Sequence, residues 1–171
     1  PSIRNEAYCR LEVNITRRRR KIYGNNKIGA FRYVFQVNIQ TINTCNYSKV
    51  HEKCPVHHFC QMERLPTEVV YRLMHELSRF DYMGVVMFSL YNEPMADGRF
   101  YEFCRYAREV CPSAIVFLNT NGAYLNEQTI KLVEQAGVGG IFVSAYDVHE
   151  YDRLSQLKSR IGLCIQPMEL D

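Results

Sequence analysis

Short apolar runs alternate with amphipathic segments from residue 31 to the end of the chain. Five of the apolar runs have the length of β-strands: residues 33–42, 84–90, 114–118, 140–145 and 162–167. Four of the segments between them carry apolar residues at helical spacing, over residues 66–80, 99–110, 126–136 and 149–159. This alternation predicts parallel strands joined by helical crossovers.

The predicted fold class is α/β, a partial parallel (β/α) barrel of about five to six strands. In such folds the chemistry takes place at the carboxyl ends of the strands. Polar residues follow all five predicted strands: Asn43 and Cys45, then Asn92 and Glu93, then Asn119 and Asn121, then Ser144 and Asp147, then Gln166. We therefore expect a functional site along this edge of the sheet.

Residues 1–30 do not share this pattern and are interpreted as an N-terminal extension, with residues 31–171 as the barrel core. The extension contains a basic run, Arg-Arg-Arg-Arg-Lys, at residues 17–21. Such a run is typical of a solvated charged surface. It is also compatible with contact to an anionic substrate or partner, and the sequence does not decide between the two.

Composition restricts the possible classes of protein. The chain is 47% hydrophobic and 23% charged, as expected for a globular domain with a sizeable core. A formal net charge of +3 argues against a dedicated nucleic-acid binder, and no apolar run reaches the roughly 18 residues of a membrane span. Seven cysteines without a secretory signal favour reduced thiols and metal ligands, and hence a cytoplasmic location.

The loop after the first predicted strand is the most informative part of the sequence. Within sixteen residues it contains three cysteines, Cys45, Cys54 and Cys60. It also contains three histidines, His51, His57 and His58. Zinc and iron–sulfur clusters both favour thiolate ligands. One histidine could complete a four-ligand zinc site, whereas a cluster bound by three cysteines would leave one iron open, so both remain possible at this point.

This loop resembles the cysteine loop of the radical S-adenosylmethionine (AdoMet) superfamily with residues inserted. The family usually has three and then two residues between its cysteines, and here there are eight and five. Phe59 matches the aromatic residue directly before the family's third cysteine. The resemblance implies a [4Fe-4S] cluster bound by Cys45, Cys54 and Cys60.

The resemblance extends over residues 31–171. Residues 91–94 resemble the segment that contacts the methionine amino group of AdoMet, and residues 119–122 resemble the family's Thr-Asn-Gly turn. Residues 144–147 and 151–154 resemble the stretch that binds ribose and carboxylate, and residues 162–166 resemble the strand that lines the adenine. The cofactor-binding residues implied in this way are Phe59, Asn92, Glu93, Asn119, Asn121, Ser144, Asp147, Arg153 and Gln166.

The resemblance also suggests individual roles. Glu93 would accept a hydrogen bond from the ammonium group of AdoMet, and Arg153 would pair with its carboxylate. Asp147 or Ser144 would bind the ribose hydroxyls. For Glu93, Asp147 and Arg153, capping or surface pairing between helices and loops is the alternative.

The implied function is that of a radical AdoMet enzyme, an oxidoreductase that reductively cleaves AdoMet to a 5′-deoxyadenosyl radical. That radical would abstract hydrogen from a peptide or a small natural product, with an external one-electron donor. The nearest branch is the SPASM/twitch-like one that modifies peptides or aminocyclitols. Two alternatives remain: a zinc-stabilised, non-catalytic binding domain that uses the Cys/His loop, and a relative that keeps the barrel without the cluster.

Overall fold

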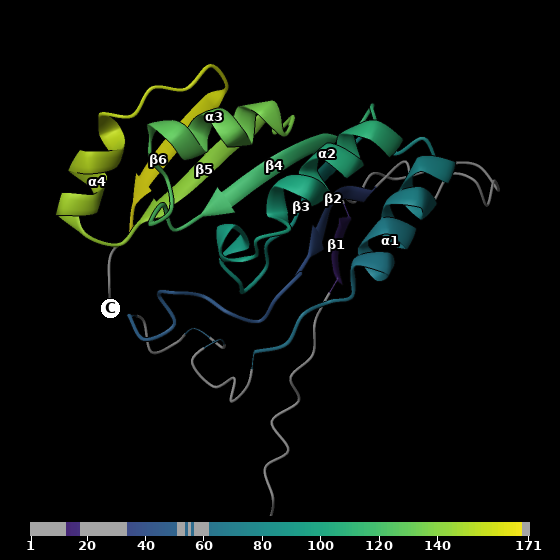
Figure 1. The fold of residues 1–171 in the computed structure, drawn as a ribbon, viewed down its shortest axis with the longest axis horizontal. Helices are drawn as coiled ribbons and strands as arrows, with labels where there is room; N and C mark the ends of the chain where they lie inside the picture. Colours follow the sequence, from purple (N-terminus) through teal and green to yellow (C-terminus); the bar gives the residue numbers. More distant parts are fainter. Residues whose placement is uncertain (1–12, 18–33, 51–53, 55, 57–61, 169–171) are drawn as a thin grey trace, which may run out of the picture.

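A computed structural model describes residues 13–17, 34–50, 54, 56 and 62–168 of the chain (Figure 1). Its sheet has six strands that lie side by side in sequence order. β2 (Val34–Ile39), β3 (Val85–Met87), β4 (Ile115–Thr120), β5 (Gly140–Ala145) and β6 (Gly162–Pro167) are parallel. Each of these strands overlaps one of the five predicted runs, and β4 extends two residues beyond its run, so the α/β partial-barrel prediction is confirmed.

The strands are connected by the predicted helices. They are α1 (Thr67–Arg79), α2 (Phe100–Val110), α3 (Glu127–Gln135) and α4 (Val148–Ser155), with a 3₁₀ turn, η4 (Pro94–Ala96), before α2. Right-handed crossovers in a sheet whose strand order follows the sequence place every helix on the same face. All four helices contribute to a single hydrophobic core with that face. No helix in the described part of the chain is long and apolar enough to cross a membrane.

The two faces of the sheet differ in character. Successive strand residues point to opposite faces, and Val86, Val116 and Ile141 point into the core against the helices. On the inner, concave face the parallel register places Asn119 beside Phe142 and Ser144 beside Gln166. The outer face is therefore apolar, whereas the inner face carries polar side chains.

The structure also contains a strand that the sequence analysis did not predict. β1 (Val13–Arg17) pairs antiparallel with β2 and adds a sixth strand at that edge. Residues 13–17 were assigned to the N-terminal extension, so part of this extension belongs to the sheet of the core. The signal was missed because the strand is short and runs into the basic segment.

Two strands are shorter than predicted. β2 ends at Ile39 rather than residue 42 because the chain turns to pair with residues 63–65. β3 ends at Met87 rather than residue 90. There the Asn92 side chain accepts a hydrogen bond from Leu90 N at 3.0 Å and donates one to Phe88 O at 3.1 Å, which closes a turn.

Candidate active site

The cysteine loop is closed at its base by a short antiparallel pairing. Leu65 N donates to Thr41 O at 2.8 Å, and Asn43 N donates to Glu63 O at 3.3 Å. The Asn43 side chain accepts a further hydrogen bond from Glu63 N at 2.7 Å. The two ends of the loop are therefore adjacent, so extra residues lengthen the loop without displacing the strand and helix on either side of it.

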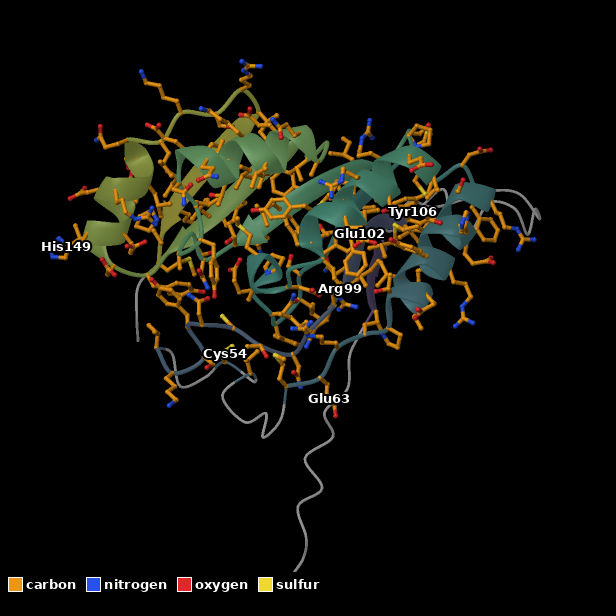
Figure 2. The ribbon with its side chains drawn as sticks, viewed as in Figure 1. Cys54, Glu63, Arg99, Glu102, Tyr106 and His149 are labelled. Atoms are coloured by element: carbon orange, nitrogen blue, oxygen red, sulfur yellow. The ribbon has the colours of Figure 1, made fainter. Side chains whose placement is uncertain are left out.

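Arg99 holds both ends of this loop. Its guanidinium donates to Leu65 O at 2.9 Å and to Thr41 O at 3.4 Å. It also pairs bidentately with Asp97, through Nε at 3.0 Å and Nη2 at 2.9 Å. Burial by itself would raise the pKa of Asp97, but hydrogen bonds from Arg99 and Thr41 outweigh burial and hold this pKa below its usual value. Figure 2 shows Arg99 near the base of the loop.

A cavity of about 350 Å³ lies between this loop and the carboxyl ends of the strands. The loop runs along that end of the sheet (Figure 1), and Cys54 belongs to it (Figure 2). The lining residues come from the loop and from the ends of β3, β4 and β5: Cys45, Cys54, Ser89, Leu90, Tyr91, Asn92, Glu93, Asn119, Thr120, Asn121, Ser144 and Tyr146.

Glu93 is the buried carboxylate of this cavity, with 2% of its surface exposed. It accepts hydrogen bonds from Thr120 Oγ1 at 2.7 Å, Asn121 N at 2.8 Å and Met95 N at 3.2 Å. Burial raises the pKa of Glu93, although these hydrogen bonds oppose the shift. Because a carboxylate has about four acceptor positions, Glu93 retains capacity for one more donor.

Asn121 connects the end of β4 to the cysteine loop. Its Nδ2 donates to Asn46 Oδ1 at 2.8 Å and to Cys45 Sγ at 3.6 Å. Burial is the main cause that raises the pKa of Cys45, and the charge of Glu93 adds to it. The Asn121 amide therefore directs one donor at the sulfur that would bind an iron–sulfur cluster.

The turn after Asn121 depends on a glycine. Gly122 has a φ of +81°, and a Cβ built there would lie 2.7 Å from Val143 Cγ1 and 2.8 Å from Leu154 Cδ1. Both the left-handed backbone and the lack of space exclude a larger residue. This turn brings the chain close to β5 and α4 and fixes the position of Asn121 at the cavity.

Seven of the predicted site residues lie together in the cavity lining: Cys45, Cys54, Asn92, Glu93, Asn119, Asn121 and Ser144. The lining also contains residues that the sequence analysis did not select, such as Ser89, Thr120 and Tyr146. The first two are strand-end residues that the same rule could have included. Tyr146 stacks at a tilt on Tyr47 of the loop, with ring centroids 5.5 Å apart, and only the three-dimensional structure reveals this contact.

Three predicted residues lie outside the lining. Asp147 caps α4 and accepts a hydrogen bond from Glu150 N at 2.8 Å. Arg153 donates to Gly122 O at 2.9 Å and Leu125 O at 2.6 Å, and it also pairs with Glu150. Gln166 is exposed at the end of β6.

Two further predictions, Phe59 and Cys60, fall outside the described residues, as do the three histidines of the loop. Among the residues that the structure describes, no group of three or more His, Cys, Asp and Glu side chains could hold a metal ion. The third predicted ligand is not part of that search, so the three-cysteine ligand set stays a prediction. Cys45 and Cys54 both line the same cavity, and this donor set fits a thiolate-bound cluster.

Comparisons with known proteins identify the fold. Neither a protein-family model nor a curated protein matches the chain. The crystal structure of BtrN in complex with AdoMet and 2-DOIA matches with a TM-score of 0.66 and 19% identity, covering 77% of this chain and 56% of that one. The structure of selenomethionine BtrN in an open conformation matches with a TM-score of 0.63 and 18% identity, covering 79% and 56%.

This chain therefore spans little more than half the length of those two structures. At this level of identity the likeness establishes the fold. It confirms the predicted α/β partial barrel.

Proposed function

We propose that the chain is the barrel part of a radical AdoMet enzyme, in which Cys45, Cys54 and Cys60 bind a [4Fe-4S] cluster. The observation that carries the proposal is the cavity at the strand ends, where two loop cysteines meet Glu93 and Asn121. The match to a structure determined in complex with AdoMet supports the same cofactor here. Because the loop is closed at its base, its longer cysteine spacing is compatible with three converging thiolates.

When bound, the cluster would supply one electron to AdoMet, whose C5′–S bond breaks to give methionine and a 5′-deoxyadenosyl radical that takes a hydrogen atom from the substrate. The protein's own residues would bind and orient the reactants. Glu93 has an acceptor position for the ammonium group of AdoMet, and Asn119 and Ser144 offer an amide and a hydroxyl for its ribose. Gln166, at the end of β6, would lie towards the adenine.

Asp147 and Arg153 receive different roles from those that the resemblance implied. Asp147 begins α4, and Arg153 holds the carbonyls of Gly122 and Leu125. In this proposal Arg153 positions the Asn121–Gly122 turn instead of pairing with the AdoMet carboxylate, and Asp147 caps α4 instead of binding the ribose hydroxyls. Asn92 acts similarly, because its side chain closes the turn after β3.

A small molecule is the favoured substrate over a peptide, because the matching BtrN structure is a complex with the small molecule 2-DOIA. An external one-electron donor would reduce the cluster. We also place the enzyme in the cytoplasm, where its thiols would remain reduced.

The proposal is tested by anaerobic reconstitution with iron and sulfide. The protein should become brown, with absorbance near ~410 nm from thiolate-bound iron–sulfur, and should form 5′-deoxyadenosine with dithionite and AdoMet. Cys45→Ala, Cys54→Ala and Cys60→Ala should each abolish cluster assembly. Cys164→Ala is the matched control, because Cys164 is exposed and lies outside the cavity lining, and it should retain full iron content.

Stoichiometric zinc, no colour and no deoxyadenosine would contradict the proposal and favour a zinc-stabilised binding domain. Full iron content in Cys60→Ala would show that another residue, such as a loop histidine, supplies the third ligand.

A further inference from the structure

Two buried polar side chains at the ends of β2 and β3 have no hydrogen-bond partner within the described part of the chain. Gln40 is 0% exposed, and neither its Nε2 nor its Oε1 is paired. Ser89 is 5% exposed, and its Oγ is unpaired. Buried polar groups are costly when unpaired, and native proteins almost always satisfy them. These three atoms therefore lack a partner among the described residues.

Both side chains belong to the inner face of the sheet. In the parallel register Asn38 lies beside Met87, so two residues further along Gln40 comes beside Ser89. The neighbours of Gln40 point the other way: Ile39 is in the core, and the Thr41 hydroxyl bonds Asp97. Ser89 lines the 350 Å³ cavity. Continuing this register thus places Gln40 next to Ser89 on the inner face, with Ser89 at the cavity.

At the two preceding inward positions of β2 the side-chain amides are hydrogen-bonded to each other. Gln36 Nε2 donates to Asn38 Oδ1 at 2.6 Å, so these two side chains pair with each other. The Gln40 side chain makes no such hydrogen bond to any residue that the structure describes. The contrast indicates that the partner of the Gln40 amide comes from outside this strand.

We propose that Gln40 and Ser89 form a substrate subsite that binds neutral, adjacent hydroxyl groups, as on a polyhydroxylated ring. An amide offers a donor and an acceptor and a serine hydroxyl offers either, and two neighbouring alcohols complement them. A carboxylate or phosphate would leave Gln40 Oε1 unpaired. It would also lack a cation, since Glu93 is the one charged side chain among the described lining residues. The subsite rests on the proposed function, because the cavity beside it is assigned to AdoMet.

The test uses the full chain, reconstituted with its cluster and loaded with AdoMet. The probes are myo-inositol, which presents neighbouring neutral hydroxyls, and cyclohexanecarboxylate, a ring that carries a carboxylate and no hydroxyl. Binding is measured by saturation-transfer NMR titration. The wild-type protein should bind myo-inositol in preference to cyclohexanecarboxylate. Gln40→Leu and Ser89→Ala should each weaken myo-inositol binding by about tenfold, the effect of one lost hydrogen bond. Gln40→Leu should leave AdoMet affinity unchanged, because Gln40 is not among the lining residues of the AdoMet cavity.

Thermal unfolding of the ligand-free protein gives a second readout. Replacing an unpaired buried amide by an apolar group of similar shape removes a cost, so Gln40→Leu should raise Tm by about 2–4 °C. Gln128→Leu, at an exposed position of α3, is the matched control and should change neither Tm nor binding.

The subsite is wrong if wild-type protein with AdoMet bound does not bind myo-inositol. It is also wrong if Gln40→Leu lowers Tm, because the amide then has a structural partner, or if AdoMet affinity falls in parallel, because Gln40 then belongs to the cofactor site. Failure of the proposed function looks different: the wild-type protein would neither bind AdoMet nor form deoxyadenosine. Binding of myo-inositol that depends on Gln40 would still support the subsite in that case.

Discussion

The two faces of the same sheet differ in chemistry, because the outer face is apolar whereas the inner face mixes apolar and polar side chains. On the outer face the side chains of Val86, Val116 and Ile141 are buried against the helices and have no polar atoms to satisfy. On the inner face Gln40 and Ser89 are also buried, but their side chains have no hydrogen-bond partner among the described residues. Burial of apolar surface is the main favourable term in folding, whereas an unpaired polar group opposes it. The comparison teaches that stability comes from one side of these strands and binding capacity from the other.

The largest effect on stability is expected in the core against the outer face of the sheet. Phe103 is fully buried on α2, with its ring 5.7 Å from Phe88. Phe103→Ala should lower the free energy of unfolding by about 3–5 kcal/mol, because the cavity left behind cannot refill. Urea denaturation measures this change. Met83→Ala, at an exposed residue, should change it by less than about 0.5 kcal/mol; equal losses in both variants would contradict the assignment of the core.

The next largest effect on stability is expected at the base of the cysteine loop, next to the candidate active site. Arg99→Met leaves the Asp97 carboxylate buried without its cation and should cost about 2–4 kcal/mol. This cost lies near the lower end of the range for breaking a buried ion pair, because the Arg99 side chain is partly exposed. Hydrogen exchange in residues 41–50 should also increase. Arg79→Met breaks an exposed pair with Glu76 and should cost under about 1 kcal/mol, with no change in loop exchange.

The pairing of Asp97 with Arg99 also makes the stability of the fold depend on pH. The folded pKa of Asp97 lies below its ordinary 3.8, so the carboxylate stabilises the fold above that pH, and this stabilisation is lost as pH falls through the folded pKa. Asp97→Asn should therefore cost about 1–2 kcal/mol at pH 7. The difference from wild type should shrink below pH ~3.8. Urea midpoints between pH 3 and 7 test this, and a difference independent of pH would contradict it.

The smallest effect on stability is expected at the cavity itself. Glu93→Gln removes a charge that burial disfavours, but its amide NH2 has to face a backbone donor that the carboxylate now accepts, such as Asn121 N. The free energy of unfolding should therefore fall by about 1 kcal/mol. AdoMet affinity should fall about tenfold or more, because a charged acceptor for the ammonium group is lost. Equilibrium dialysis measures this affinity, with iron content as the control. A large loss of stability with unchanged affinity would instead make Glu93 a structural cross-link.

Much of the fold was predictable because its signals are local. Apolar runs and helical spacing located five strands and four helices, since each pattern reports which side of an element is buried. The strand-end rule selected Glu93 and Asn121, because parallel strands bring their carboxyl ends to one edge. The same rule does not distinguish ligand contacts from structural ones: Asp147 caps α4 and Arg153 donates to Gly122 O, and their contact with a cofactor stays a prediction.

Other features depend on residues far apart in the chain. β1 was missed because its pairing partner lies some twenty residues away, beyond the basic run. The contact of Arg99 with Thr41 spans 58 residues, and that of Thr120 with Glu93 spans 27. No local pattern reports such pairs, since they form only when the strands assemble.

The sequence by itself determined the succession of strands and helices along the chain and the edge at which the polar residues gather. The tertiary structure decided which of those polar groups are satisfied. Glu93 accepts hydrogen bonds from Thr120 and Asn121 at the end of β4, Arg99 closes the cysteine loop, and Gln40 has no partner among the residues that the structure describes. The reason is physical: hydrophobic periodicity is a property of one element, whereas a hydrogen bond between elements requires that both be packed in place.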